Sequence, residues 1–267
     1  MINVTIAFIG SGFMARGAIR GLVESGTLAP SSILVVNEAD PAGRDEVAAL
    51  YGVTSARPAD VDRADAVFFA VKPQTFDEVC AEYAAHFSPD KLYLTIMAGM
   101  STARVAAGVG GGRVVRFMPN LALSVGLSAT AFALGDGCGE AERAIARALF
   151  EPLGEVVEVD EREISAVTAL SGSGPAYFCY LCEGMIAAAV TDGMDEAKAR
   201  SLAVQTLIGT AKLLEDSGEA PGEMRRRITS KRGTTEAAIA AMTDAGFAEA
   251  IGAGYLAARR RSDELGK

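Results

Sequence analysis

A glycine-rich sequence near the N-terminus is the first candidate for chemistry. Gly10-Ser11-Gly12-Phe13-Met14-Ala15 has the pattern G-x-G-x-x-A, follows an apolar strand predicted over 4–9 and opens a predicted helix. In that setting Gly10 permits a tight turn, Gly12 lets the backbone approach a pyrophosphate, and Ala15 allows close packing of helix on strand. The phosphates would bind unpaired amides at the helix N-terminus. The motif therefore predicts a dinucleotide site, and a glycine turn without a ligand is the alternative.

Two more candidate residues follow the next predicted strands. Glu38 comes after Asn37 and a strand predicted over 32–36, where an acidic residue binds the 2′-hydroxyl of an adenosine ribose and repels a 2′-phosphate. Lys72 follows a buried strand in Ala70-Val71-Lys72-Pro73. Because ligands of doubly wound sheets bind beyond the carboxyl ends of the strands, Lys72 could face the dinucleotide. A lysine that meets only solvent at a strand exit is the alternative.

Hydroxyl groups are concentrated in a third segment, Ile228-Thr229-Ser230-Lys231-Arg232-Gly233-Thr234-Thr235-Glu236, which leads into a predicted helix. Thr234 or Thr235 is expected to be the N-cap residue of this helix, and Glu236 suits the positive end of its dipole. Hydroxyls and free amides at such a point would suit a substrate carboxylate. Many helices begin with threonine and bind nothing, so both interpretations stay open.

The chain has few residues for acid–base or metal chemistry. His86 is the only histidine, which excludes a Ser-His-Asp triad and a His-rich metal site, and no metal is expected. Cys179 and Cys182 are expected to be buried apolar residues rather than a redox or metal pair. No lysine lies between Lys91 and Lys198, so the catalytic lysine that β-hydroxyacid dehydrogenases carry early in their second domain has no counterpart. Hydride addition to a polarised C=N bond needs little acid–base help and fits these residues better.

The overall composition limits the partners and the location of the chain. Its formal charge of −9 and pI near 4.8 argue against nucleic acid or an anionic membrane as partner. The arginine clusters 225–227 and 259–261 are interpreted as solvated helix faces. The uncharged runs 117–135 and 164–182 are interrupted by proline, glycine and serine, so neither is predicted to span a membrane. With no signal-peptide pattern after Met1, we expect a cytoplasmic protein.

Strand and helix signals alternate through the first part of the chain and then give way to helices alone. The alternation predicts a Rossmann-like, doubly wound, mostly parallel α/β sheet over residues 1–161, the dinucleotide-binding domain. Residues 162–267 are expected to form an all-helical domain for dimerisation and substrate binding. The stretch 201–211 carries no charge, and a helix that is apolar nearly all round must be covered. We expect a second subunit to cover it.

Several specific motifs occur in order along nearly the whole chain: the glycine motif, Ala70-Val71-Lys72-Pro73-Gln74, Met118-Pro119-Asn120, Thr168-Ala169-Leu170-Ser171-Gly172-Ser173-Gly174-Pro175-Ala176-Tyr177, Gln205-Thr206, Thr229-Ser230, Gly233-Thr234-Thr235 and Gly246-Phe247. Together they resemble pyrroline-5-carboxylate reductases. The resemblance implies reduction of 1-pyrroline-5-carboxylate to L-proline, the last step of proline synthesis, with NADPH or NADH. It also implies a homodimer with interleaved helical domains, which in this family often assembles into a decamer.

The resemblance assigns roles to residues at matching positions. Thr235 would be the catalytic residue, with its hydroxyl bonded to the ring nitrogen of the substrate. Ser230, Gly233 and Thr234 would complete the substrate site, with the two hydroxyls on the carboxylate. The residues expected to bind the cofactor are Ile9, Gly10, Ser11, Gly12, Phe13, Met14, Asn37, Glu38, Ala70, Val71, Lys72, Pro73, Met97 and Ala98.

Three departures from the family pattern leave alternatives open. The family's Ser-Pro-Gly-Gly is Ser230-Lys231-Arg232-Gly233 here, and its Asn-Thr-Pro is Asn120-Leu121-Ala122. A related reductase of another cyclic imine acid and a catalytically inactive dinucleotide-binding regulator therefore stay as alternative hypotheses. The family often has Asn-Arg where this chain has Asn37-Glu38. We therefore expect NADH to serve at least as well as NADPH, unless Arg44 or Arg57 binds the 2′-phosphate.

Overall fold

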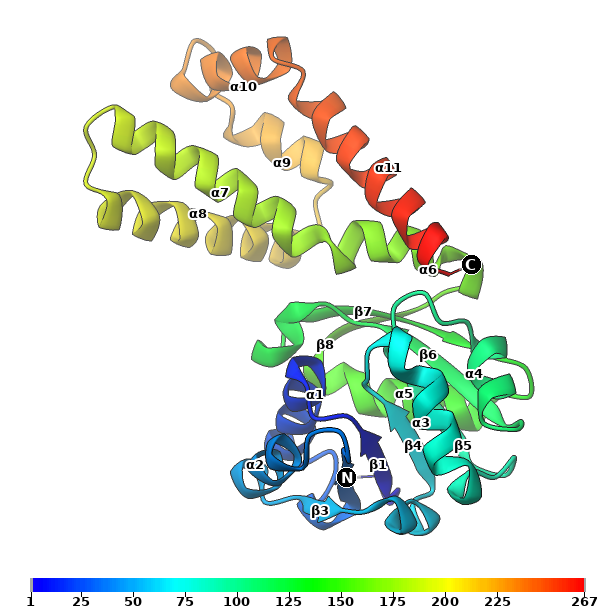
Figure 1. The fold of residues 1–267 in the computed structure, drawn as a ribbon. Helices are drawn as coiled ribbons and strands as arrows, with labels where there is room; N and C mark the ends of the chain where they lie inside the picture. The colour runs from blue at the N-terminus through cyan, green and yellow to red at the C-terminus, as the bar shows by residue number, and fades with distance from the viewer. Residues whose placement is uncertain (1, 267) are drawn as a thin grey trace. The chain divides into compact units, whose positions relative to one another are not determined.

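The structure is a computed structural model that describes residues 2–266 of the 267-residue chain (Figure 1). The chain divides into two compact units. Unit 1 runs to Ser173 and takes in the C-terminal stretch that begins at Ala258, whereas unit 2 is Gly174–Ala257. The domain boundary expected at residue 161 is not tested by this division and stays a prediction.

Unit 1 contains one sheet of eight strands. They are β1 (Ile6–Ile9), β2 (Ile33–Val36), β3 (Thr54–Ala56), β4 (Ala66–Phe69), β5 (Leu92–Thr95), β6 (Arg113–Met118), β7 (Ser128–Leu134) and β8 (Gly154–Glu158). Their order in the sheet is β3-β2-β1-β4-β5-β6-β7-β8. Neighbouring strands are parallel except for β6 and β7, which run antiparallel. The predicted doubly wound, mostly parallel fold is confirmed.

Helices cover both faces of this sheet (Figure 1). They are α1 (Phe13–Glu24), α2 (Pro41–Tyr51), α3 (Phe76–Tyr83), α4 (Thr102–Gly108), α5 (Glu140–Phe150) and α6 (Ile164–Val167). In β1, Ile6 and Phe8 join one apolar cluster with residues of α1, α2 and α5. Ala7 and Ile9 point to the other face, where α3 and α4 complete a second cluster. Because both faces are buried, the strand shows the continuous apolar pattern of a central parallel strand.

Unit 2 is helical throughout. Its helices are α7 (Gly174–Thr191), α8 (Glu196–Ser217), α9 (Pro221–Ile228), α10 (Thr234–Asp244) and the first part of α11 (Phe247–Leu265). Helices α7 and α8 lie side by side (Figure 1). Within 174–257, all of which the structure describes, only four residues are buried in the single chain: Gly174, Ala199, Ala203 and Met224. Unit 2 therefore has almost no interior of its own.

The predicted alternation of strands and helices in the first part of the chain, and the helices predicted after it, are confirmed. The structure also contains β3, α4 and β8, which the sequence pattern did not indicate. A π-helical turn, Thr168–Gly172, separates α6 from α7 within the run 164–182. The run 117–135 contains the end of β6 and all of β7. Across residues 2–266, no helix combines the length and the apolar character needed to cross a membrane.

Candidate cofactor and substrate sites

The carboxyl ends of β2, β1, β4 and β5 form the edge at which the cofactor residues are predicted. Backbone hydrogen bonds hold this edge together just beyond the strands. The amide of Gly10 donates to the carbonyl of Val36 at 2.9 Å. The amide of Ala70 donates to the carbonyl of Ile9 at 3.0 Å. Since these strands are neighbours, the edge brings together the four groups of predicted cofactor residues, which are 9–14, 37–38, 70–73 and 97–98.

Glycine is needed at the two positions of the motif for different structural reasons. Gly10 has a φ of +111°, and a Cβ atom added there would lie 2.7 Å from the carbonyl oxygen of Ala70. Gly12 is the N-cap of α1 with a φ of −71°, and an added Cβ would meet nothing within 4 Å. No side chain of the described residues caps this helix. The first amides of α1 therefore face an open space that suits a pyrophosphate, and the residues present fit a dinucleotide.

The other predicted cofactor residues offer different groups. Ile9 and Met97 are each 2% exposed and pack into the apolar core, so only their backbone atoms are available to a ligand. Phe13 and Ala98 are exposed. Lys72 is exposed as well, and its ammonium group pairs with no acidic residue of the described chain. Its charge is therefore available to a phosphate at the strand exit.

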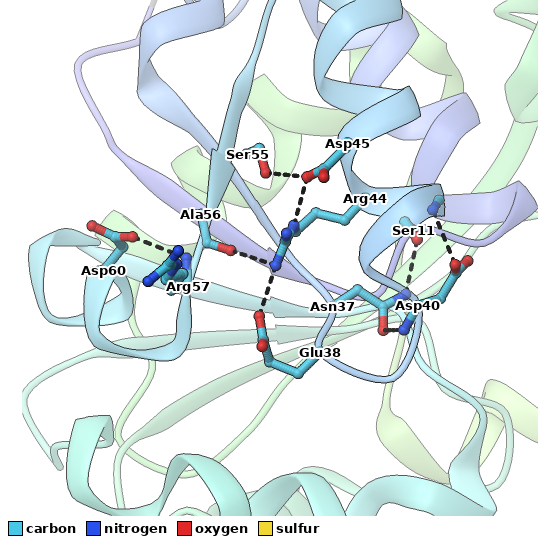
Figure 2. Close-up of polar contacts among 11 residues, drawn as sticks. Ser11, Asn37, Glu38, Asp40, Arg44, Asp45, Ser55, Ala56, Arg57 and Asp60 are labelled. Atoms are coloured by element: carbon cyan, nitrogen blue, oxygen red, sulfur yellow. Dashed lines mark hydrogen bonds and ion pairs between the residues drawn. The ribbon is translucent and has the colours of Figure 1, made fainter.

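A chain of hydrogen bonds joins the glycine loop to the segment that follows β2 (Figure 2). Asn37 Nδ2 donates to Ser11 Oγ at 2.8 Å, and Asn37 Oδ1 accepts from the amide of Asp40 at 3.3 Å. Asp40 Oδ1 in turn accepts from the amide of Gly43 at 3.0 Å and so caps α2. Asn37 therefore holds both the buried Ser11 hydroxyl and the turn that carries Glu38.

Glu38 is paired with Arg44 (Figure 2). Arg44 Nη1 donates to Glu38 Oε1 at 2.7 Å, and Arg44 Nε donates to Asp45 Oδ1 at 2.9 Å. Ser55 Oγ also donates to Asp45 Oδ1, at 2.5 Å. The hydrogen bond from Ser55, followed by that from Arg44, lowers the pKa of Asp45 below its ordinary value. The position predicted to bind the adenosine ribose thus carries an ion pair, and Arg57 lies exposed nearby.

His86 lies at the opposite edge of the sheet. It ends the turn 84–86 that leads from α3 toward β5, and its Nδ1 is 3.1 Å from Asp62 Oδ1. Both residues line a cavity of about 620 Å³ that adjoins the amino ends of β4 and β5. The histidine is therefore remote from the glycine loop. No group of three or more His, Cys, Asp or Glu residues that could hold a metal ion occurs in the described part of the chain.

The predicted substrate residues lie in unit 2, where the chain enters α10. The expected N-cap was wrong: Gly233 is the N-cap, and Thr234 and Thr235 are the first two helical residues. The physical reason is that the amide of Gly233 donates to the carbonyl of Ser230 at 3.0 Å, which closes a turn one residue earlier. A Cβ atom on Gly233 would overlap Ser230 Oγ. Glycine therefore allows the Ser230 hydroxyl to lie against the start of the helix.

Three hydroxyl groups at this helix start have no hydrogen-bond partner among residues 2–266, namely those of Ser230, Thr234 and Thr235. Other threonines of unit 2 donate to the carbonyl four residues earlier, as Thr206 and Thr229 do at 2.8 and 2.6 Å. The unpartnered hydroxyls lie beside the first-turn amides of α10. This arrangement can bind a small carboxylate and one further polar atom.

Arg232 holds an unusual conformation within the same turn. It is the one non-glycine residue of the described chain with a positive φ, which is 58°. Its amide donates to Glu236 Oε2 at 2.6 Å, and Glu236 lies in the first turn of α10. The strained turn and this hydrogen bond together fix the path of the chain between Ser230 and Gly233.

Unit 2 exposes an extended apolar surface in the single chain. In the uncharged stretch 201–211, Leu202 is 59% and Ile208 is 56% exposed. Cys179 is exposed and Cys182 is partly buried, so the expectation that both are buried is wrong for the single chain. The reason is that α7 is also uncovered, with Phe178 and Tyr180 exposed. Large exposed apolar areas mark interaction surfaces.

Comparisons with known proteins match both parts of the chain. Residues 161–265 match the family described as pyrroline-5-carboxylate reductase dimerisation, and residues 5–99 match the family described as NADP oxidoreductase, coenzyme F420-dependent. The pyrroline-5-carboxylate reductase of Synechocystis is 37% identical over an alignment of 269 positions, which covers 100% of each chain.

Solved structures of the same kind have a similar fold. A pyrroline-5-carboxylate reductase from Coxiella burnetii is 31% identical with a TM-score of 0.90, and the match covers 100% of both chains. The pyrroline carboxylate reductase of Plasmodium falciparum, whose structure has NADP bound, is 21% identical with a TM-score of 0.88 over 100% of both chains.

Proposed function

Because this chain belongs to the pyrroline-5-carboxylate reductase family, we propose that it reduces 1-pyrroline-5-carboxylate to L-proline with a hydride from NADPH or NADH. The observation that carries the proposal is that one chain of this family contains two ligand-binding arrangements. A glycine loop opens an uncapped helix at the carboxyl edge of a parallel sheet, and a turn with three free hydroxyls opens α10. The first arrangement suits a dinucleotide pyrophosphate and the second a small carboxylate.

The residues of unit 1 would hold the cofactor, which supplies the hydride when bound. Gly12 and the first amides of α1 would hold the pyrophosphate, and the Lys72 ammonium group would add a positive charge near it. Asn37 would keep Ser11 and the ribose-binding turn in place through its two hydrogen bonds. Ile9 and Met97 would contribute backbone atoms only, because their side chains belong to the core.

The residues of the α10 turn would bind and orient the substrate. The hydroxyls of Ser230 and Thr234, with the adjacent amides, would hold the carboxylate. The Thr235 hydroxyl would accept a hydrogen bond from the protonated ring nitrogen and donate one when that nitrogen is neutral. A strong acid is unnecessary because the nitrogen loses its positive charge as the carbon accepts the hydride. Fixing two bound reactants in position supplies a large part of the rate enhancement.

The working form is a dimer that is built through the helical domain (residues 162–267), and dimers assemble further into a decamer. Residues 1–161 form the domain that binds the dinucleotide. Support comes from the exposed apolar surface of α7 and α8 and from the match to a dimerisation family. The net charge of −9 disfavours nucleic acid and anionic membranes as partners. All four cysteines are free, which suits the reducing cytoplasm.

The test follows the near-ultraviolet absorbance of the reduced cofactor as it is oxidised. The purified chain receives pyrroline-5-carboxylate, its six-membered-ring homologue, or no imine. We expect oxidation that requires an imine and is fastest with the five-membered ring. Faster oxidation with the six-membered ring would assign another substrate. Cofactor binding without oxidation by either imine would leave the inactive regulator as the better hypothesis.

A further inference from the structure

We propose that Glu38 and Arg44 act as a pair that selects NADH over NADPH. Glu38 binds the hydroxyls of the adenosine ribose, and Arg44 is held by Glu38 so that it cannot serve a 2′-phosphate. This inference rests on the proposed function only in taking a reduced nicotinamide dinucleotide as the ligand of unit 1.

The geometry of the pair assigns a different task to each side chain. Glu38 is the second residue beyond β2, and its side chain is 36% exposed, whereas that of Arg44 is 13% exposed. Only Oε1 of Glu38 accepts from Arg44, and Oε2 accepts no hydrogen bond from the residues that the structure describes. A carboxylate oxygen is therefore left to accept from ribose hydroxyls, as acidic residues after the second strand do in dinucleotide-binding folds.

Arg44 is restrained on several sides. Besides the bond to Glu38, its Nε donates to Asp45, and its Nη1 lies 3.5 Å from the carbonyl oxygen of Ala56 (Figure 2). Asp45 is itself fixed by Ser55. Two carboxylates thus share one guanidinium group, so Arg44 offers no uncompensated positive charge to an incoming phosphate.

The surrounding charge opposes a 2′-phosphate as well. Glu38 and Asp45 both pair with the one guanidinium group of Arg44 (Figure 2), so this cluster carries one more negative than positive charge. A phosphate monoester carries a charge of about −1.5 to −2 at neutral pH, whereas a ribose hydroxyl is neutral and donates a hydrogen bond. The local excess of negative charge therefore favours the cofactor without the phosphate.

The pair also predicts what happens when Glu38 loses its charge. Glu38→Gln keeps the size of the side chain but weakens the hold on Arg44 Nη1 and removes one negative charge. Arg44 would then be able to donate to a 2′-phosphate, because guanidinium groups bind phosphate strongly. The exposed Arg57, whose side chain pairs with no described residue, is the competing phosphate ligand.

The experiment measures the dissociation constants of NADH and NADPH by titrating the fluorescence of the reduced nicotinamide, with no imine present. In the wild-type chain NADH should bind at least as tightly as NADPH. In Glu38→Gln the NADPH affinity should rise at least tenfold while the NADH affinity falls a few-fold. Adding Arg44→Met to Glu38→Gln should remove the gain for NADPH. Glu24→Gln is the matched control, because it removes the same charge from the exposed Glu24–Arg20 pair of α1 and should leave both constants unchanged.

Each other outcome overturns a defined part of this inference. An unchanged ratio of the two constants in Glu38→Gln would show that Glu38 does not select the cofactor. A gain that survives Arg44→Met would assign the phosphate to another cation such as Arg57 and overturn the role of Arg44. Failure of the wild-type chain to bind either cofactor would overturn the proposed function itself, which separates the two failures.

Discussion

The two glycines of the loop after β1 allow binding to be separated from folding. Gly12→Ala adds a methyl group where, apart from its own neighbours in sequence, no atom of the described residues lies within 4 Å, at a φ of −71° that alanine adopts freely. Alanine is a poorer N-cap than glycine by about 0.5 kcal/mol, and its smaller entropy loss on folding offsets a similar amount. The free energy of unfolding should therefore change by less than about 0.5 kcal/mol. The affinity for NADH should fall at least tenfold, or about 1.4 kcal/mol, because the methyl group occupies the pyrophosphate space.

Gly10→Ala should behave in the opposite way. Its Cβ would lie 2.7 Å from the Ala70 carbonyl oxygen, at a φ of +111°. Backbone strain and overpacking should together lower the free energy of unfolding by roughly 2–4 kcal/mol. Denaturant unfolding and cofactor titration measure the two effects separately. Gly17→Ala, on the same helix as Gly12 but with its Cβ in ordinary contact 3.5 Å from Ser124, is the control and should leave cofactor affinity unchanged. Wild-type NADH affinity in Gly12→Ala would refute the assignment of the pyrophosphate site.

Three further predictions concern the substrate turn, the assembly and acid stability. Thr235→Ala should lower kcat/KM by about tenfold to a thousandfold, or 1.4 to 4 kcal/mol, with cofactor affinity little changed. Thr235→Ser should keep much of the activity because the hydroxyl remains. Steady-state kinetics of the two variants tests both expectations. Ile208→Glu should shift the protein toward monomers in sedimentation, because Ile208 is 56% exposed on α8, whereas Leu50→Glu on α2 of unit 1 should not. The amide of Gly139 donates to the Glu142 carboxylate and holds the pKa of Glu142 below its ordinary value of 4.5. The contribution of this carboxylate to the free energy of unfolding is therefore complete above pH 4.5 and is lost as the pH falls through the lower pKa of the folded state. Glu142→Gln should therefore reduce the acid dependence of unfolding below about pH 4.5, and an unchanged dependence would contradict this.

The elements that could be predicted from the sequence are those with a clear local pattern, such as a continuous apolar run or a glycine motif. β1 was predictable because Ile6, Phe8 and Ile9 are apolar on both faces, and the glycine pattern fixed the turn that follows it. β3, α4 and β8 were not predicted because few of their residues are buried, so none of them forms a continuous apolar run. Only one residue of β3 is buried, and β8 is half exposed at the edge of the sheet. Such elements are held by pairing with neighbours, which a local pattern does not report.

The candidate site shows the same difference between local and tertiary information. Glu38 was identifiable from its place after a strand, and Arg44 only as one of two nearby arginines. Their pairing depends on how α2 folds back beside the end of β2, so it became visible only in the structure. The N-cap of α10 was wrong because the Gly233–Ser230 hydrogen bond, rather than a threonine side chain, starts the helix.

Hydride transfer to the C=N bond of 1-pyrroline-5-carboxylate is the proposed reaction of this chain. The most direct measurement incubates the purified protein with this imine and reduced cofactor, then quantifies L-proline and oxidised cofactor in the same sample. We expect equal amounts of the two products in the wild-type protein and a large loss of both in Thr235→Ala. Cofactor oxidation without proline, or proline formation that is unchanged in Thr235→Ala, would contradict it.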